Sequence, residues 1–463
     1  MSAAVPIRRY AGASGASGPL LFLPDARGAV LGEWVVLEAP GACPRRGQVI
    51  EIGTDLTVIQ LLDDVHGLAP ASATITLTGE LAGTPVGREL LGRVLDGAGR
   101  PVDDLPAPVG TAWRPVWGAP LNPVRRARPA DVIHTGISAI DGLNTLVRGQ
   151  KLPVFSGPGL PGLELAARVV ESASVPGGEP FAVVFVAIGI TEREARAFLE
   201  RFEDREALER TVVFLNRTSD PTLERLMAPR LGLTVAEHLA FEEGLQVLVV
   251  MADMTHYCEA LREIAAYREE IPGRRGYPGY MYTDLASLFE RAGILRGGRG
   301  SLTQLPVLTM PDDDITHPIP DLTGYITEGQ IVLGRDLHRR GVSPPVDVLP
   351  SLSRLMKSGI GEGRTAPFHR AWSDQMYALY ARGREARLTA SVIGQAGLSD
   401  ADRRALEFAD RFEGEFLDQG RRARTFEETF RIGWRMLESM PRESLLRIDD
   451  ETWARRPAAA EED

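Results

Sequence analysis

The feature that most constrains this chain is the glycine-rich stretch FSGPGLPGLE at residues 155–164, between an apolar strand pattern and an amphipathic helix pattern. Gly157 and Gly162 have the spacing of the phosphate-binding loop G-x-x-x-x-G-K-[ST], which joins a strand to a helix. Leu163 stands where that motif has its lysine, and Glu164 where it has the hydroxyl that binds magnesium. The order strand, glycine loop, helix therefore predicts an α/β domain whose loop lacks the side chains needed for phosphoryl transfer.

Backbone N–H groups of such a loop can still hold an anion weakly. The candidate residues for a degenerate nucleotide site are Gly157, Pro158, Gly159 and Gly162. Pro158 removes one N–H donor, and a carboxylate at Glu164 repels a triphosphate. Lys151 precedes the strand and cannot replace the missing lysine, so we expect it to be solvent-exposed.

A second candidate residue, Asp253, follows the apolar strand pattern of residues 245–252. Its position fits the acidic residue that closes a Walker B strand. A carboxylate there also suits the N-cap of the helix predicted from Thr255, and the sequence leaves both interpretations open.

Three types of pattern follow one another along the chain. Short β-rich runs separated by Gly and Pro predict an antiparallel β-barrel over residues 1–80. Alternating strands and helices predict a mostly parallel sheet within residues 81–366, which include a connector with seven prolines at 101–129. Helical patterns alone predict an α-helical domain at residues 367–452, and residues 453–463 have the composition of a disordered tail.

Composition excludes several classes of function. The net charge of −11 argues against nucleic acid as the main partner. The longest apolar runs are about half of the ~20 residues that cross a bilayer, and the first residues lack a secretory signal, so we expect membrane contact only through a partner. Cys43 and Cys258 lie far apart without metal-ligand spacing, and we predict no metal site.

Seven motifs between residues 92 and 356 resemble one family, the non-catalytic B subunit of V-type and A-type rotary ATPases, and the resemblance extends over nearly everything from residue 10 to residue 448. They are GRVLDGAGRP at 92–101, NPVRRARP at 122–129, TGISAID at 135–141, PVFSGPGLP at 153–161, GYPGYMYTD at 276–284, DDDITHP at 312–318 and PSLSRLM at 350–356.

The resemblance implies that the domain at residues 81–366 is a RecA-like, degenerate nucleotide-binding domain. It also implies that three such chains alternate with three catalytic A subunits around central stalk subunits, with a peripheral stalk. It implies a cytoplasmic complex that couples ATP synthesis or hydrolysis to proton or sodium transport and touches the membrane only through its ion-translocating sector. No cofactor is obligatory; ATP or ADP is expected at subunit interfaces, with Mg²⁺ held mainly by the A subunit.

The resemblance also assigns a role to Arg354 in the segment PPVDVLPSLSR, where the family has its arginine finger. A guanidinium delivered to the neighbouring A subunit stabilises transition-state charge. We interpret the prolines as restricting the conformation of the segment that leads to Arg354. We interpret Ser351 and Ser353 as small residues that let the backbone of a partner subunit come close. The chain alone is predicted not to be an enzyme, because Ile190 replaces the glutamate that polarises water in rotary ATPases. The alternative is a pseudo-ATPase scaffold with no part in catalysis.

Further candidates are contacts with the stalk. Asp312, Asp313 and Asp314 resemble the loop that faces the central bearing, and adjacent acidic residues lack the spacing of a metal loop. Ser399 and Asp400 open an acidic helix that resembles the stalk-contacting loop, and they also suit a plain helix N-cap.

Overall fold

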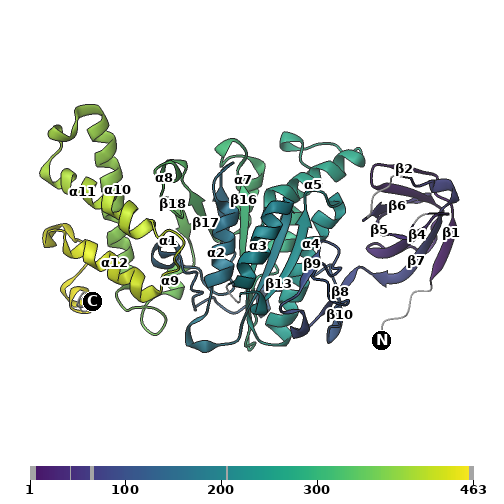
Figure 1. The fold of residues 1–463 in the computed structure, drawn as a ribbon, viewed down its shortest axis with the longest axis horizontal. Helices are drawn as coiled ribbons and strands as arrows, with labels where there is room; N and C mark the ends of the chain where they lie inside the picture. The colour runs from purple at the N-terminus through teal and green to yellow at the C-terminus, as the bar shows by residue number, and fades with distance from the viewer. Residues whose placement is uncertain (1–6, 42, 63–66, 205–206, 458–463) are drawn as a thin grey trace.

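The computed structural model describes residues 7–41, 43–62, 67–204 and 207–457. Three units follow one another along its longest axis: a β-domain with the N-terminus, a central α/β domain, and a helical domain with the C-terminus (Figure 1). The predicted fold class is confirmed, and the order of the units follows the change from period-2 to helical patterns along the chain.

The β-domain is a seven-stranded antiparallel sheet in the order β1-β7-β4-β5-β6-β3-β2. Alternate side chains of its strands, such as Val35 and Leu37, point into one apolar core. Its strands are β1 (Arg8–Ala11), β2 (Gly15–Ser17), β3 (Leu20–Pro24), β4 (Glu33–Glu38), β5 (Arg45–Ile52), β6 (Leu56–Leu61) and β7 (Thr74–Leu81).

The central domain contains a nine-stranded sheet in the order β18-β17-β11-β16-β14-β12-β13-β9, with β15 paired to β16. Its pairs are parallel except β17–β18 and β15–β16. The strands are β9 (Val94–Asp96), β11 (Val154–Ser156), β12 (Phe181–Ile190), β13 (Thr211–Arg217), β14 (Gln246–Ala252), β15 (Gly293–Ile294), β16 (Ser301–Thr309), β17 (Gly329–Leu333) and β18 (Val346–Ser353). In the connecting region, β8 (Gly83–Val86) pairs with β10 (Ala112–Pro115).

Helices cover both faces of this sheet, so its strands are apolar on both sides. Along β12, Val183 and Phe185 pack with helices α2 and α3, whereas Val184 and Val186 pack with α4, α5 and α6. The helices are α1 (Ser138–Leu143), α2 (Gly162–Ser172), α3 (Glu192–Asp204), α4 (Thr222–Glu237), α5 (Met254–Tyr267), α6 (Met281–Phe289), α7 (Pro318–Ile326), α8 (Arg335–Arg339) and α9 (Met356–Gly359).

One helix differs from the sequence pattern. The sequence pattern predicts two helices here, at residues 222–228 and 235–243. The structure instead forms the single helix α4, which contains Pro229 and continues as one π-turn to Glu242. Pro229 has no N–H and so removes one backbone hydrogen bond of the helix. Residues before and after Pro229 are buried against the sheet, and this packing outweighs the loss of that bond.

The helical domain consists of α10 (His369–Ile393), α11 (Asp400–Arg411), α12 (Phe426–Glu438) and α13 (Asp450–Ala454). Its core is aromatic: Trp372 contacts Phe416 and Phe430, and Trp434 contacts Phe368. The sequence predicts a disordered tail from residue 453, but the structure shows contacts there. Trp453 packs on Trp434, and Arg456 pairs with Glu438 at 2.9 Å. Residues 453–456 are therefore ordered by these contacts, and residues 458–463 lie outside the described part.

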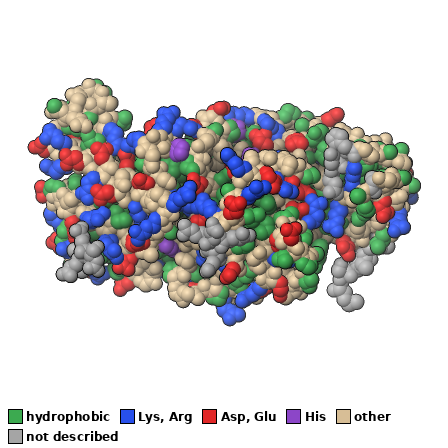
Figure 2. Space-filling view, in the orientation of Figure 1, with side chains coloured by type: hydrophobic (Ala, Val, Ile, Leu, Met, Phe, Trp, Pro, Cys, Tyr) green, Lys and Arg blue, Asp and Glu red, His purple; other side chains and the backbone are tan. Residues whose placement is uncertain are grey.

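Within the described residues, no helix is both long enough and apolar enough to span a membrane. Basic and acidic side chains are interspersed over the face that Figure 2 shows. This mixture fits the modest negative net charge of −11.

Candidate functional site

The glycine loop lies where the sequence predicts, at the carboxyl end of β11 in the middle of the parallel sheet. Gly162 begins α2, and a Cβ atom there would lie 2.8 Å from that of Ser156, so only glycine lets the helix start so close to the strand. Gly159 has a φ of +76°, which also favours glycine. The four predicted loop residues thus form one turn of phosphate-loop shape.

The chemistry of the loop is lost. Leu163, in the place of the lysine, packs with Leu160 against the apolar core beneath α2. Glu164 puts a carboxylate in the first turn of the helix. These residues supply neither the ammonium group nor the hydroxyl that a Mg²⁺-bound triphosphate requires, so the side chains present do not fit that group.

A side-chain clamp that the sequence did not predict closes over this loop. Arg335, the first residue of α8, donates to both carboxylate oxygens of Asp313 at 2.7 and 2.9 Å and to the carbonyl of Pro158 at 2.9 Å. The Arg335 guanidinium lowers the pKa of Asp313. Any Cβ on Gly157 would collide with the Asp313 carboxylate. Because these residues are far apart in sequence, only the tertiary structure reveals the clamp.

Asp253 lies at the same edge of the sheet, two strands away from β11. One carboxylate oxygen accepts from the N–H of Thr255 at 2.7 Å and so caps α5; the other accepts from the hydroxyl of Thr309. Thr309 belongs to β16, the strand between β14 and β11. Of the two interpretations from sequence, the structure shows the cap, and both oxygens are engaged.

The position of the missing catalytic glutamate is apolar. Ile190 is 1% exposed and belongs to the core under α3. Gly189 before it has a φ of +63° and lies against His256. Thr191 after it accepts from and donates to Glu194, which closes the N-terminus of α3. This segment therefore packs as part of the structure, with an apolar side chain at the position of the missing glutamate.

Arg354 follows β18 in an exposed turn. Its backbone N–H donates to the carbonyl of Glu328 at 3.0 Å, which fixes the turn. Its guanidinium forms no hydrogen bond or ion pair with any residue that the structure describes. The side chain is therefore an exposed cation on a fixed backbone.

The interpretation of the two serines was wrong. Ser351 and Ser353 are each 7% exposed and do not face outwards. The hydroxyl of Ser351 donates to the carbonyl of Asp347, and that of Ser353 donates to the carbonyl of Thr145. Ser353 thus anchors β18 to the segment after α1, and Ser351 also accepts from the N–H of Val332 in β17. Leu352 between them is exposed.

The sheet separates Arg354 from the glycine loop. The loop leaves the carboxyl end of β11, and β17 runs parallel to β11. Because β18 runs antiparallel to β17, its last residue, Ser353, pairs with the first residue of β17, Gly329. The 5 residues of β17 span about 16 Å at ~3.3 Å each. Arg354 thus lies at the opposite edge of the sheet and cannot reach its own loop.

Lys151 also differs from expectation, because it is buried at 3% exposure. Its ammonium group pairs with Glu290 at 2.7 Å and with Glu328 at 3.0 Å. Two carboxylates compensate the loss of water around a buried ammonium. Lys151 therefore stabilises the amino edge of the sheet, where Arg354 emerges.

The predicted stalk contacts are separated in space. Asp313 pairs with Arg335 as described above, and Asp312 is exposed. Asp314 accepts from the N–H of Thr316 and pairs with Arg275 at 2.8 Å. These contacts lower the pKa of Asp314 to about 2. Ser399 and Asp400 belong to another unit, the helical domain, where Ser399 caps α11 by accepting from the N–H of Asp402.

Three segments match known families. Residues 14–79 match the ATP synthase alpha/beta family, beta-barrel domain; residues 136–353 match its nucleotide-binding domain; and residues 358–456 match the C-terminal domain of V and A type ATP synthase. The V-type ATP synthase beta chain of Anaeromyxobacter sp. (strain K) is 60% identical over 97% of this chain and 96% of its own length. The chain belongs to the V-type ATP synthase beta-chain family.

Other members support this assignment. The V-type ATP synthase beta chain of Anaeromyxobacter sp. (strain Fw109-5) is 60% identical over 95% of this chain and 96% of its own length. A solved structure, the ATP synthase subunit NeqB from Nanoarcheaum equitans, superposes with a TM-score of 0.72 at 36% identity. That match covers 91% of this chain and 100% of the NeqB chain. The family resemblance read from the motifs is thus confirmed.

Proposed function

We propose that this chain is the non-catalytic, regulatory B subunit of a V/A-type rotary ATPase and supplies Arg354 in trans to catalytic sites on neighbouring A subunits. The observation that carries the proposal is the position of Arg354 at the sheet edge opposite the chain's own loop. Under this proposal, the exposed guanidinium that cannot reach its own loop serves the next subunit.

The chemistry follows from the arginine side chain. When the terminal phosphoryl group of ATP transfers, negative charge spreads over its equatorial oxygens, and a planar guanidinium stabilises that charge with two parallel hydrogen bonds. Such fingers accelerate phosphoryl transfer by about 10³- to 10⁵-fold. Because Arg354 has no ionic partner among the described residues, its charge is not compensated within the subunit.

The chain's own loop has a different role in this proposal. Leu163, Ile190 and the clamped Asp313 leave it without a lysine, a base or an open phosphate position. The loop then serves as structure that seats the B subunit in the ring. Nucleotide at this interface is regulatory at most, and the Mg²⁺ of catalysis belongs to the A subunit.

The experiment is steady-state ATP hydrolysis by a reconstituted ring of A and B subunits. We expect Arg354→Ala and Arg354→Lys to lower kcat by about 10³-fold or more. Alanine removes the positive charge, and lysine keeps the charge but cannot donate two parallel hydrogen bonds as a planar guanidinium does. Lys357→Ala removes an exposed cation three residues further on and is the matched control, with near-normal kcat. The isolated chain should hydrolyse no ATP.

The alternative, a scaffold without a part in catalysis, predicts that both Arg354 variants turn over normally in assembled rings. Measuring assembly by gel filtration beside kcat separates the two functions. In either case we propose that the ring contacts central and peripheral stalk subunits and couples its turnover to proton or sodium transport.

A further inference from the structure

We propose that Gln150 is a positioning residue for Arg354, because it fixes the backbone from which the guanidinium reaches the neighbouring subunit. This role rests on the proposed function of Arg354 in trans. Gln150 is 0% exposed and lies just before β11, the strand next to β17. It therefore approaches the segment that carries Arg354 from inside the domain.

The side-chain amide of Gln150 bridges two segments that meet at Arg354. Its Nε2 donates to the carbonyl of Glu328 at 3.1 Å and to the hydroxyl of Ser353 at 3.0 Å. Ser353 directly precedes Arg354, and the carbonyl of Glu328 also accepts from the backbone N–H of Arg354 at 3.0 Å. One buried amide thus joins the residue before Arg354 to the group that accepts from the N–H of Arg354.

Both ends of this bridge are themselves fixed. The Oε1 of Gln150 accepts from the N–H of Val147 at 2.9 Å, so only one orientation of the amide satisfies its donors and its acceptor. The carboxylate of Glu328 accepts from the N–H of Lys151 at 2.8 Å and pairs with the Lys151 ammonium at 3.0 Å. A buried polar network whose members are all satisfied is rigid. The network therefore holds the Cα of Arg354 in one place.

The position of this backbone matters because the side chain of Arg354 has no other anchor in the part of the chain that the structure describes. The guanidinium is exposed and unpaired there, so the point that it can reach is set by its Cα. A displacement of about 1 Å at a reacting centre can cost about 10²-fold in rate. Loss of the Gln150 bridge should therefore lower kcat. The affinity for ATP should change little, because under this proposal ATP binds to the A subunit.

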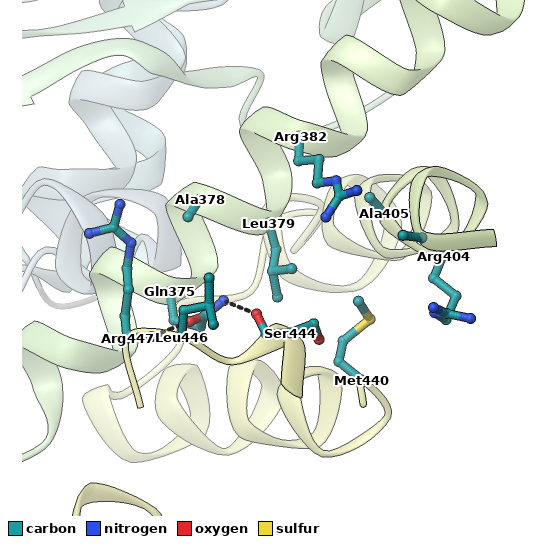
Figure 3. Close-up of a pocket in the computed structure, with 11 residues that line it drawn as sticks. Gln375, Ala378, Leu379, Arg382, Arg404, Ala405, Met440, Ser444, Leu446 and Arg447 are labelled. Atoms are coloured by element: carbon teal, nitrogen blue, oxygen red, sulfur yellow. Dashed lines mark hydrogen bonds between the residues drawn. The ribbon is translucent and has the colours of Figure 1, made fainter. Parts of the chain in front are cut away.

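The helical domain offers a matched control residue. Gln375 of α10 is 2% exposed and lines a cavity of about 420 Å³ among α10, α11 and the segment after α12 (Figure 3). Like Gln150, it donates to a backbone carbonyl, that of Ser444, and accepts from a backbone N–H, that of Arg447. These two hydrogen bonds stay within the helical domain. Loss of the Gln375 amide therefore removes contacts of the same kind without releasing the anchor of Arg354.

The test measures ATP hydrolysis by reconstituted rings of A and B subunits. We expect Gln150→Met to lower kcat by about 10- to 100-fold and to change the KM for ATP by less than about twofold. Gln375→Met should retain near-normal kcat. Gel filtration checks that each variant assembles. Ser353→Ala removes only the hydroxyl that accepts from Gln150, so it is the milder second variant and should lower kcat by about fivefold.

A double-mutant cycle separates positioning from general damage. Rings with Arg354→Ala have no guanidinium to position, so adding Gln150→Met to them should lower kcat by less than about twofold further. An equal loss of kcat in both backgrounds, or normal kcat in Gln150→Met and Ser353→Ala rings, overturns the positioning role and leaves the role of Arg354 intact. Normal kcat in rings with Arg354→Ala alone would instead overturn the proposed function, and the positioning role with it.

Discussion

At the scale of single residues, the side chain of Arg335 holds the glycine loop. Arg335 bridges the carbonyl of Pro158 and the carboxylate of Asp313, so the shape of the loop depends on a bidentate ion pair. The pair is partly exposed, with side-chain exposures of 35% and 44%, so solvent screens it and its contribution to stability is small.

We predict that Arg335→Ala loosens the loop without unfolding the domain. Amide hydrogen exchange over residues 157–162 should accelerate by up to about fivefold. Arg339→Ala, on the same short helix, removes a longer and more exposed pair with Asp336 and should leave that exchange unchanged. Equal exchange in both variants would show that the clamp does not stabilise the loop.

Sequence reasoning succeeded at residues whose role depends on local spacing and failed where it depends on distant partners. The glycine positions and the lost lysine follow from neighbours along the chain, and the cap at Asp253 was one of the two interpretations that the sequence left open. The burial of Lys151 and Ser353 depends on Glu328 and Thr145, which no local pattern connects to them. Arg335 was missed for the same reason.

At the scale of elements, close helix packing depends on single glycines. Gly383 lets α10 approach α11, because any Cβ there would collide with the carbonyl of Ala405 and approach the Cβ of Ala409 to 2.5 Å. The helical hairpin that carries Ser399 at the start of α11 depends on this approach.

We predict that Gly383→Ala destabilises the chain by about 1–3 kcal/mol through overpacking, despite the higher helix propensity of alanine. Gly414 is exposed, and a methyl group added to it would have no atom within 4 Å, so Gly414→Ala should change stability by less than about 0.5 kcal/mol. Urea denaturation of both variants measures the difference. A neutral Gly383→Ala would mean that the two helices can separate freely.

At the scale of the whole molecule, the sequence predicted the order of the three units, because strand, mixed and helical patterns occupy separate stretches. It did not predict how the units join. His369 of α10 illustrates this: it lies fully buried against the carbonyl of Gly142 in α1, where the helical domain meets the central domain.

This junction predicts a pH dependence of stability. Burial lowers the pKa of His369 to about 4, so the folded chain holds it neutral. Below pH 6.5 the unfolded chain binds a proton that the folded chain does not, and stability falls as the pH drops from 6.5 towards 4, by about 3 kcal/mol in total. Above pH 6.5 the residue contributes no pH dependence.

Denaturation of the wild type and of His369→Gln between pH 7 and pH 5 checks this prediction, since the variant lacks the titrating group. The loss of stability over this range should be smaller in the variant. Identical slopes would show that His369 is protonated in the folded chain and that burial does not control its charge.

The central claim, that Arg354 acts in trans, concerns the transition state, and the most direct measurement traps a mimic of that state. Aluminium fluoride with ADP imitates the transferring phosphoryl group, and its retention requires the groups that stabilise the transition state. We predict that reconstituted rings with wild-type B subunits retain ADP–aluminium fluoride through gel filtration. Rings with Arg354→Ala should bind ADP but release it. Equal retention by both rings would contradict the account.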